Sequence, residues 1–276
     1  MSYDPKPTKY PFPDDTSMHY LKIKKDNGMV FDKNYPFIDK SKWFNFKRNI
    51  IRIPLTLIVF PFARLKVGLK IEGKKNLKKH KELIKNGVIS VSNHIHMWDY
   101  ICIMRAIRPI KPYTLVWAPN IKGENGTLAR LVGGIPIPEN NLSGNIAFMK
   151  SVGGLLKDDG GWLHIYAEGS MWEYYKPIRP FKTGATSFAI INDKPIIPMA
   201  FSYRKPGLFC KLFKIPAKLT LRIGEPLTKD NTLPSSKQKE DLLIRCHDEV
   251  CRLAGIDPKD NIYEPIYNDS KKINYY

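Results

Sequence analysis

The sequence is short of acidic residues. Its 276 residues include 26 Asp and Glu against 45 Lys and Arg, a formal net charge of +19. An excess of this size indicates an anionic partner, such as nucleic acid, an anionic membrane surface or a phosphorylated substrate. The alternative is a basic protein with no special partner. The stretch from Lys40 to Lys85 holds 14 basic and two acidic residues, a net of +12, so the excess is concentrated near the N-terminal side.

Cysteine is also rare. The four residues, Cys102, Cys210, Cys246 and Cys251, include no CxxC pair, which excludes a zinc knuckle and a thioredoxin-type redox motif. We expect all four to be reduced and mostly buried, with Cys246 and Cys251 on one helix. Reduced cysteines fit a cytosolic setting.

No apolar stretch of the N-terminal region is long enough to cross a bilayer. The uncharged run from Ile53 to Ala63 has 11 residues, whereas a membrane-spanning helix needs about 20. Pro54 and Pro61 also predict a break in any helix there. The first residues, MSYDPKPTKYPFPDD, contain no apolar segment of the kind found in signal peptides.

Two interpretations remain for this apolar segment. It packs on the protein's own core, or it lies in a membrane interface with Trp43, Phe44 and Phe46 at the level of the lipid head groups. Its flanks are strongly basic, and each Lys or Arg near an anionic surface contributes about 1 kcal/mol to binding. No zinc finger, helix-turn-helix or RNP-like pattern is legible. We therefore expect an anionic membrane surface as partner, and no nucleic acid.

Beyond this segment, predicted strands alternate with predicted helices. The expected strands cover residues 67–73, 88–92, 113–118, 162–169, 195–203 and 218–226. The expected helices cover residues 76–87, the stretch after Asp99, the stretch before residue 133, and residues 144–157, 184–192 and 235–255. For the helix over residues 235–255, the sequence predicts a serine at the N-cap and a glycine that ends the helix. The alternation predicts an α/β fold with a largely parallel twisted sheet flanked by helices.

Four regions follow from these patterns. Residues 1–38 form an arm with little regular structure, whose aromatic residues we expect to pack on the main domain. Residues 39–66 form the basic, apolar membrane-docking segment. Residues 67–255 form the main domain, and residues 256–276 form a C-terminal tail.

The stretch VISVSNHIHMWDY, residues 88–100, carries the chemistry. His94 comes just after a predicted strand, and ligands of open α/β sheets bind at the carboxyl ends of strands. Asp99 follows five residues later, so the two meet only if His94 lies in a turn and Asp99 in the first helical turn. Asp99 would then accept the Nδ1 proton and leave Nε2 as a base for a substrate hydroxyl or amine. The alternative is that His94 merely caps the following helix.

His96, between these two residues, superficially suggests a metal site. The metallo-hydrolase signature is HxHxDH, whereas here the aspartate comes one place late and no third histidine follows it. We therefore expect no metal.

Four blocks, in this order and spacing, resemble the glycerolipid acyltransferase superfamily of the lysophosphatidic acid acyltransferase type. They are NHIHMWD (93–99), GGIPIPEN (133–140), IYAEGSMW (165–172) and KPIIPMAF (194–201), and FKTGA (181–185) adds to the match. The resemblance covers roughly residues 67–226. It implies that the main domain is an acyltransferase domain.

The resemblance also implies a mechanism and a set of site residues. His94 would take the proton from an acceptor hydroxyl, and Asp99 would orient His94. Glu168, Gly169 and Ser170 would help to form the acceptor pocket. The acyl donor would be acyl-CoA or an acyl carrier protein, used as a substrate, with no bound cofactor and no covalent acyl-enzyme.

The chain departs from the family at two positions where phosphate-binding arginines are expected. Met171 follows the Glu-Gly-Ser block, and Glu139 ends the Gly-Ile-Pro block. Neither can replace an arginine–phosphate contact, and glutamate repels phosphate. The positive charge is then either supplied from nearby or not needed, because the acceptor is a glycolipid or an amino lipid. The candidate replacements are Lys122, Lys176, Arg179 and Lys182.

The sequence thus predicts a peripheral enzyme of phospholipid biosynthesis on the cytoplasmic face of a membrane. It would acylate a lysophospholipid, and the favoured acceptor is 1-acylglycerol-3-phosphate. The alternatives are an acyltransferase for a non-phosphate lipid and a membrane lipid-binding protein without turnover.

Overall fold

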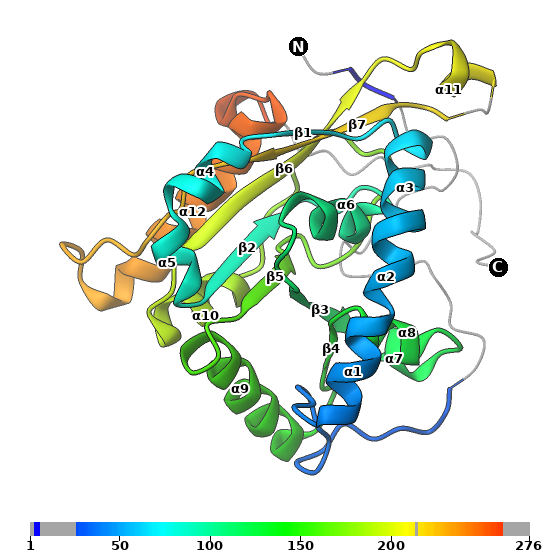
Figure 1. The fold of residues 1–276 in the computed structure, drawn as a ribbon. Helices are drawn as coiled ribbons and strands as arrows, with labels where there is room; N and C mark the ends of the chain where they lie inside the picture. Colours follow the sequence, from blue (N-terminus) through cyan, green and yellow to red (C-terminus); the bar gives the residue numbers. More distant parts are fainter. Residues whose placement is uncertain (1–2, 6–25, 213–214, 262–276) are drawn as a thin grey trace, which may run out of the picture.

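The chain forms a seven-stranded sheet covered by helices, as the computed structural model in Figure 1 shows for residues 3–5, 26–212 and 215–261. The strands are β1 (Lys70–Glu72), β2 (Val88–Ser92), β3 (Tyr113–Trp117), β4 (Gly134–Ile137), β5 (Trp162–Tyr166), β6 (Ile196–Arg204) and β7 (Lys218–Ile223). Their order is β1-β7-β6-β2-β5-β3-β4. Neighbouring strands are parallel except for β6 and β7, which are antiparallel. The predicted α/β fold with a largely parallel sheet is confirmed.

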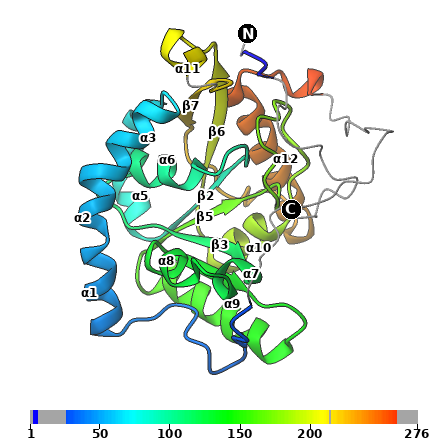
Figure 2. The same cartoon turned by 90° about the vertical axis from the view of Figure 1, so that its right-hand side faces the viewer.

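The helices cover both faces of this sheet (Figure 1, Figure 2). They are α1 (Lys42–Ile50), α2 (Arg52–Pro54), the π-helical turn η1 (Leu55–Val59), α3 (Phe60–Lys66), α4 (Lys74–Lys79), α5 (Lys81–Lys85), α6 (Asp99–Ala106), α7 (Ala118–Lys122), α8 (Gly126–Leu131), α9 (Leu142–Lys157), α10 (Gly184–Asn192), α11 (Leu208–Leu212), α12 (Ser235–Ala254) and the 3-10 turn η2 (Pro258–Asp260). Across the described residues, no helix combines the length and apolar character needed to span a bilayer.

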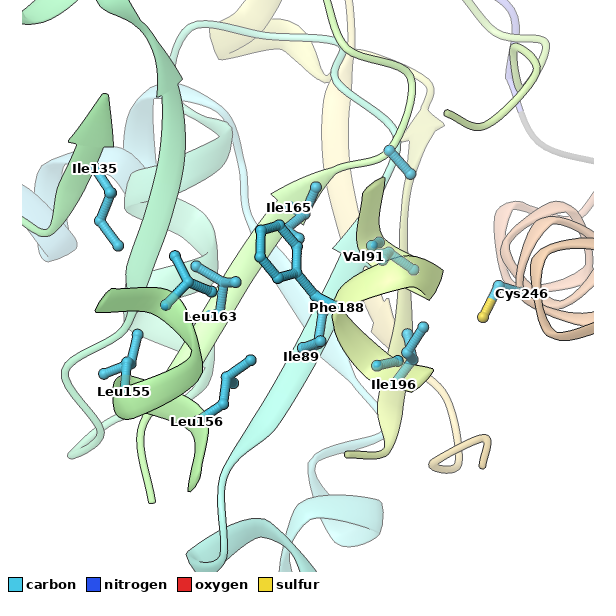
Figure 3. Close-up of a cluster of buried hydrophobic side chains, with 14 of the residues drawn as sticks. Ile89, Val91, Ile135, Leu155, Leu156, Leu163, Ile165, Phe188, Ile196 and Cys246 are labelled. Atoms are coloured by element: carbon cyan, nitrogen blue, oxygen red, sulfur yellow. The ribbon is translucent and has the colours of Figure 1, made fainter. Parts of the chain in front are cut away.

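The larger core lies between the sheet and helices α9, α10 and α12. Ile89 and Val91 of β2 alternate with residues of the opposite face, as the two-residue period of a strand requires, and contact the cluster drawn in Figure 3. Phe188 of α10 and Cys246 of α12 join the same cluster. A second core on the other face packs α6 against the sheet through Cys102 and Ile103. All four cysteines are free and buried, as expected, with Cys246 and Cys251 both on α12.

A helix over residues 42–66 was expected to be broken at Pro54 and Pro61. Helix α2 does end at Pro54, where the π-helical turn η1 begins, but the chain stays helical through Pro61. Helices α1 to α3 with η1 follow one another as a nearly continuous column (Figure 2). Pro61 lies in the first turn of α3, where an N–H donor is not needed. The π-helical turn before it shifts the hydrogen bonds, so that the Phe60 N–H donates to the Leu55 carbonyl.

One side of this helical column packs on the protein, and the other is exposed. Leu55, Phe60 and Ala63 are buried, and the buried Arg48 side chain lies over the Tyr113 ring, 3.9 Å from its centroid. Eight large apolar side chains of the column are exposed: Trp43, Phe46, Ile50, Ile53, Leu57, Ile58, Phe62 and Leu65. Packing on the protein's own core is therefore confirmed for one side of the helical column. The membrane-interface interpretation stays a prediction for the exposed side.

Several local predictions differ from the structure. The expected helix at 76–87 is two short helices, α4 and α5, separated at His80. The first residue of α12 is Ser235, which follows an N-cap at Pro234 with no side-chain cap bond, so the predicted Ser N-cap is wrong. Gly255 ends this helix with a left-handed φ of 78°, as predicted. Strand β4 was not predicted, because a four-residue strand containing Pro136 carries little strand signal.

The two terminal regions are only partly described. Residues 1–2, 6–25 and 262–276 of the predicted arm and tail lie outside the described residues. Phe31 and Phe37 of the arm are buried in the larger core, which confirms that its aromatic residues pack on the main domain. In the tail, the Asn261 side chain accepts from the Ile178 N–H and donates to the Ile178 carbonyl.

Gly87, which precedes the strand that carries the site, tolerates no side chain. Its φ is +94°, and a Cβ there would clash with the carbonyl of Leu156. We expect Gly87→Ala to lower the free energy of unfolding by about 2–4 kcal/mol through left-handed strain and overpacking. Gly184→Ala is the matched control, because a Cβ there meets nothing within 4 Å, and should be neutral or stabilising by less than about 1 kcal/mol. Urea unfolding monitored by tryptophan fluorescence measures both, and equal stabilities would contradict the account.

Candidate active site

The turn after β2 is built around the carboxylate of Asp99. Asp99 is fully buried at the start of α6, and its Oδ2 accepts the N–H groups of Ile95 at 2.7 Å and His96 at 2.9 Å. The same oxygen lies 3.1 Å from Nδ1 of His94. His94 is in the turn and Asp99 in the first helical turn, which is the arrangement that the sequence required for the pair to meet.

The His94 ring has one nitrogen left for a substrate. Because Nδ1 faces a carboxylate, it donates to Asp99, and Nε2 is the ring nitrogen without a partner among the described residues. The ring stacks on Tyr166, with 3.7 Å between ring centroids and 12° between planes, and the His94 side chain is 23% exposed. Burial holds the pKa of the Tyr166 hydroxyl well above its ordinary value, so this neighbour stays neutral.

A second buried carboxylate holds the backbone of His94. Glu168 Oε2 accepts the His94 N–H at 3.0 Å and a guanidinium N–H of Arg179 at 2.8 Å, while its Oε1 accepts the Arg179 backbone N–H at 2.9 Å. Arg179 also donates to Ser170 Oγ at 2.9 Å and lies over the Trp172 ring. Both ends of the ion pair are nearly fully buried. This pair therefore joins the loop after β5 to the turn that carries His94.

Asn93 fixes the other side of the turn. Its side-chain amide donates to the carbonyl of Phe201 at 3.0 Å and accepts the Phe201 N–H at 2.8 Å. The side chain thereby extends the pairing of β2 with β6 beyond the end of β2. The backbone N–H of Trp172 also donates to the His94 carbonyl at 2.9 Å.

A buried polar chain lies on the α6 side of the sheet. Trp162 Nε1 donates to Ser90 Oγ at 2.7 Å, and Ser90 Oγ lies 2.9 Å from Nδ1 of His164. Ser92 Oγ donates to the Asn93 carbonyl, so it accepts from Nε2 of His164 at 3.3 Å. Burial lowers the pKa of His164 to about 3, which keeps this histidine neutral. His164 thus supports the backbone next to His94 without carrying charge.

His96 has a structural position. Its Nδ1 accepts the Trp98 N–H at 3.0 Å, its ring packs edge-on against Tyr174, and burial lowers its pKa. In residues 3–5, 26–212 and 215–261, no three or more His, Cys, Asp or Glu side chains are grouped in a way that could hold a metal ion.

A cavity of about 470 Å³ opens beside His94 at the carboxyl ends of β2, β5, β3 and β4. It falls within the size range of small-molecule sites, roughly 300–1,000 Å³. Its lining is mainly apolar and includes Leu115, Val116, Trp117, Ile137, Ile165, Tyr166, Ala167, Met171 and Ala185, with His94, Met97, Asn120, Glu139, Gly169, Ser170, Lys182 and Gly184. An imidazole at the edge of a mainly apolar cavity suits a substrate with a long hydrocarbon part.

The predicted substrate-binding residues separate into two groups. Gly169, Ser170 and Lys182 line the cavity, and Lys182 is the one Lys or Arg among the lining residues that the structure describes. Glu168 and Arg179 do not line the cavity, because they form a buried ion pair with each other. Their predicted contact with substrate is therefore corrected: they support the backbone around the cavity instead.

The remaining two candidates lie elsewhere. Lys122 is 3.4 Å from Asp26 and close to the Phe31 ring, away from the cavity lining. Lys176 is half-buried in the loop after β5 and also does not line the cavity. Of the four cations considered as substitutes for the family arginines, the structure brings Lys182 alone to the described cavity.

Sequence reasoning missed Tyr166 and Trp117. Both are the last residues of central strands, and both line the cavity. The rule that ligands bind at the carboxyl ends of parallel strands was available to find them. Stacking between Tyr166 and His94, however, depends on the pairing of β2 with β5, which no local pattern reveals.

The fold and this site place a histidine–aspartate pair beside a cavity at the carboxyl ends of parallel strands. Residues 68–202 match the model of the protein family described as Acyltransferase. This part of the chain is therefore an acyltransferase-like domain, in agreement with the resemblance of the four sequence blocks.

Two further comparisons were made. A search of curated protein sequences found no match. Among solved structures, the chain is similar to the 1-acyl-sn-glycerophosphate (LPA) acyltransferase PlsC from Thermotoga maritima, with 16% identity and a TM-score of 0.47 over 79% of this chain and 84% of that chain.

Removing one partner of the buried pair should be costly. We expect Arg179→Met to lower the free energy of unfolding by about 3–5 kcal/mol, because the Glu168 charge stays buried without its partner. Arg245→Met is the control, since its bond to Asp241 is partly exposed on α12 and is worth at most about 0.5 kcal/mol. Urea unfolding separates the two variants. A loss below about 1 kcal/mol for Arg179→Met would show that the pair does not hold the site.

Proposed function

We propose that the protein transfers a fatty acyl group from an acyl thioester to the hydroxyl of a lysophospholipid. The observation that carries this proposal is the His94–Asp99 pair with Nε2 at an apolar cavity. The donor is acyl-CoA or an acyl carrier protein, and the predicted acceptor is 1-acylglycerol-3-phosphate. Lys182 in the cavity lining supports an acceptor that carries a phosphate.

The proposed reaction needs no enzyme nucleophile. His94 Nε2 takes the proton of the acceptor hydroxyl as the oxygen attacks the thioester carbonyl. The C–S bond then breaks, and the thiol leaves with the proton that the imidazolium returns. Asp99 stabilises the imidazolium and holds the ring in the required tautomer, and its three hydrogen bonds in the turn keep it in place.

Two other functions were open from the sequence. An acceptor without phosphate, such as a glycolipid, is favoured by Met171 and Glu139 in the cavity lining, whereas Lys182 in the same lining favours a phosphate. A lipid-binding protein without turnover would not need an imidazole that Asp99 orients at the cavity. The oriented imidazole therefore favours the enzyme.

Loss of the base should abolish transfer. We expect His94→Gln to lower kcat by at least about 100-fold, since a general base contributes roughly 100- to 10,000-fold, and Asp99→Asn to lower it by a similar factor through the wrong tautomer. The assay incubates the purified protein with acyl-CoA and lysophosphatidic acid or other lysophospholipids and detects diacyl lipid by mass spectrometry. His80→Gln is the control, because His80 lies on the surface beside Glu225. A His94→Gln variant that keeps a tenth of the rate while remaining folded would rule out this mechanism.

We further propose that the exposed side of the helical column attaches the protein to the cytoplasmic face of an anionic membrane. Its eight exposed apolar side chains are accompanied by exposed cations at Lys42, Lys47, Arg64 and Lys66. Apolar side chains flanked by cations are the composition of interfacial helices. The free cysteines agree with the cytoplasmic side.

The attachment is tested by removing apolar area. Leu57 and Ile58 are 69% and 66% exposed. We expect the double variant Leu57→Ser, Ile58→Ser to weaken sedimentation with anionic phosphatidylglycerol vesicles by about 10-fold or more, because each side chain contributes on the order of 1–2 kcal/mol when it enters lipid. Ile244→Ser, at a similarly exposed position on α12, should bind like the unmodified protein. Equal sedimentation of all three proteins would contradict attachment through this side.

A further inference from the structure

We infer that the acceptor carries a zwitterionic head group, with a phosphate followed by an ammonium group. This inference rests on the proposed acyl transfer to a lysophospholipid, and it replaces 1-acylglycerol-3-phosphate, the acceptor expected from the sequence, by a zwitterionic lysophospholipid. It comes from two opposite charges in the cavity lining, Lys182 and Glu139, and from their order along the sheet.

Lys182 lies over the end of β5. Its backbone N–H donates to the Ala167 carbonyl at 2.8 Å. A Cβ placed on Gly169 would lie 2.9 Å from the Lys182 ammonium nitrogen and 2.8 Å from the adjacent carbon. Gly169 has a φ of +85°, so this position favours glycine for its backbone as well. Because Gly169 has no side chain, the Lys182 ammonium group can lie close to the backbone after β5, the strand adjacent to β2 and His94.

Glu139 lines the same cavity and follows β4, the edge strand of the sheet. It is exposed, two residues beyond Ile137, and Ile137 is in register with Trp117 of β3. A carboxylate in a cavity lining attracts an ammonium group through its charge. The same carboxylate repels the dianionic phosphate of a phosphatidic acid precursor. In the described part of the chain, neither Glu139 nor Lys182 forms an ion pair with another residue.

The strand order sets the positions of the three groups. His94 follows β2, Gly169 follows the adjacent β5, and Glu139 follows β4, which is three strands away from β2. With strands spaced by about 4.8 Å, Lys182 is about one spacing from the base and Glu139 is about 14 Å from it. The order from base to cavity edge is therefore hydroxyl, anion, cation.

A zwitterionic lysophospholipid has these groups in the same order and at a matching distance. About eight covalent bonds of roughly 1.5 Å join the glycerol hydroxyl oxygen to the ammonium nitrogen across the phosphodiester, an extended span of about 10 Å. One hydrogen bond of about 2.8 Å at each end brings this to about 16 Å, close to the separation of about 14 Å given by the strand spacing. Lysophosphatidic acid ends at its phosphate and leaves Glu139 without a partner.

The test compares acceptors that share one acyl chain and differ in the head group. Mixed micelles carry lysophosphatidylethanolamine, lysophosphatidylcholine, lysophosphatidic acid or lysophosphatidylglycerol, with the full-length protein and acyl-CoA. We expect kcat/KM for a zwitterionic acceptor to exceed that for lysophosphatidic acid by about 5-fold or more, because charge-assisted bonds are worth roughly a factor of ten. Preference for ethanolamine over choline, or the reverse, identifies a primary or a quaternary ammonium.

Matched variants assign this preference to the two charges. Glu139→Gln should bring the ratio of kcat/KM for a zwitterionic acceptor to kcat/KM for lysophosphatidic acid near one. It does so by lowering kcat/KM for the zwitterionic acceptor or by raising it for lysophosphatidic acid. Glu240→Gln on α12 should leave this ratio unchanged. Lys182→Gln should lower kcat/KM for all phosphate-bearing acceptors about 10-fold, and Lys176→Gln should not.

The outcomes separate this inference from the proposed function. Preference for lysophosphatidic acid, or a ratio that Glu139→Gln leaves unchanged, overturns the zwitterionic acceptor while acyl transfer stands. Folded protein that acylates none of the four acceptors contradicts the proposed function itself, and the inference fails with it.

Discussion

The carboxylate of Asp99 holds the turn after β2 in one conformation. One oxygen accepts two backbone N–H groups and faces the ring of His94, all within 3.1 Å. A buried carboxylate is costly unless it is hydrogen-bonded, so the turn must close around Asp99 for the chain to fold. The oxygen that accepts the backbone N–H groups also orients the imidazole. The bonds that close the turn therefore also fix the position of the His94 ring.

A second carboxylate connects this turn to the rest of the cavity. Glu168 binds the His94 N–H from the loop after β5 and is neutralised by Arg179 from below. Because Arg179 pairs with Glu168, Lys182 is the one cation and Glu139 the one carboxylate among the described cavity-lining residues. The charge of the cavity is thus set by which cations pair inside the protein and which stay exposed.

Much of the fold was predictable because local patterns and tertiary structure agree. β2 and α10 have the boundaries that the sequence predicted, since a β-branched run after Gly87 and an apolar stretch after FKTGA leave few alternatives. The His94–Asp99 pair was predictable from its spacing and its place after a strand. The continuity of the helical column was not, because a π-helical turn accommodates Pro61 only in the context of the neighbouring helices. Likewise, no sequence pattern separates Arg179, which is buried against Glu168, from Lys182, which is exposed at the cavity, although both follow the same block.

The central claim is direct transfer from thioester to acceptor with His94 as base, and one measurement tests it most directly. The purified protein is mixed with acyl-CoA in a single turnover, with or without a lysophospholipid, and quenched samples are analysed for protein mass and for lipid product. The account predicts an unchanged protein mass in both reactions and diacyl lipid in the reaction that contains the acceptor. An acyl adduct on the protein that is later transferred to the lipid, or the absence of any lipid product, would contradict it.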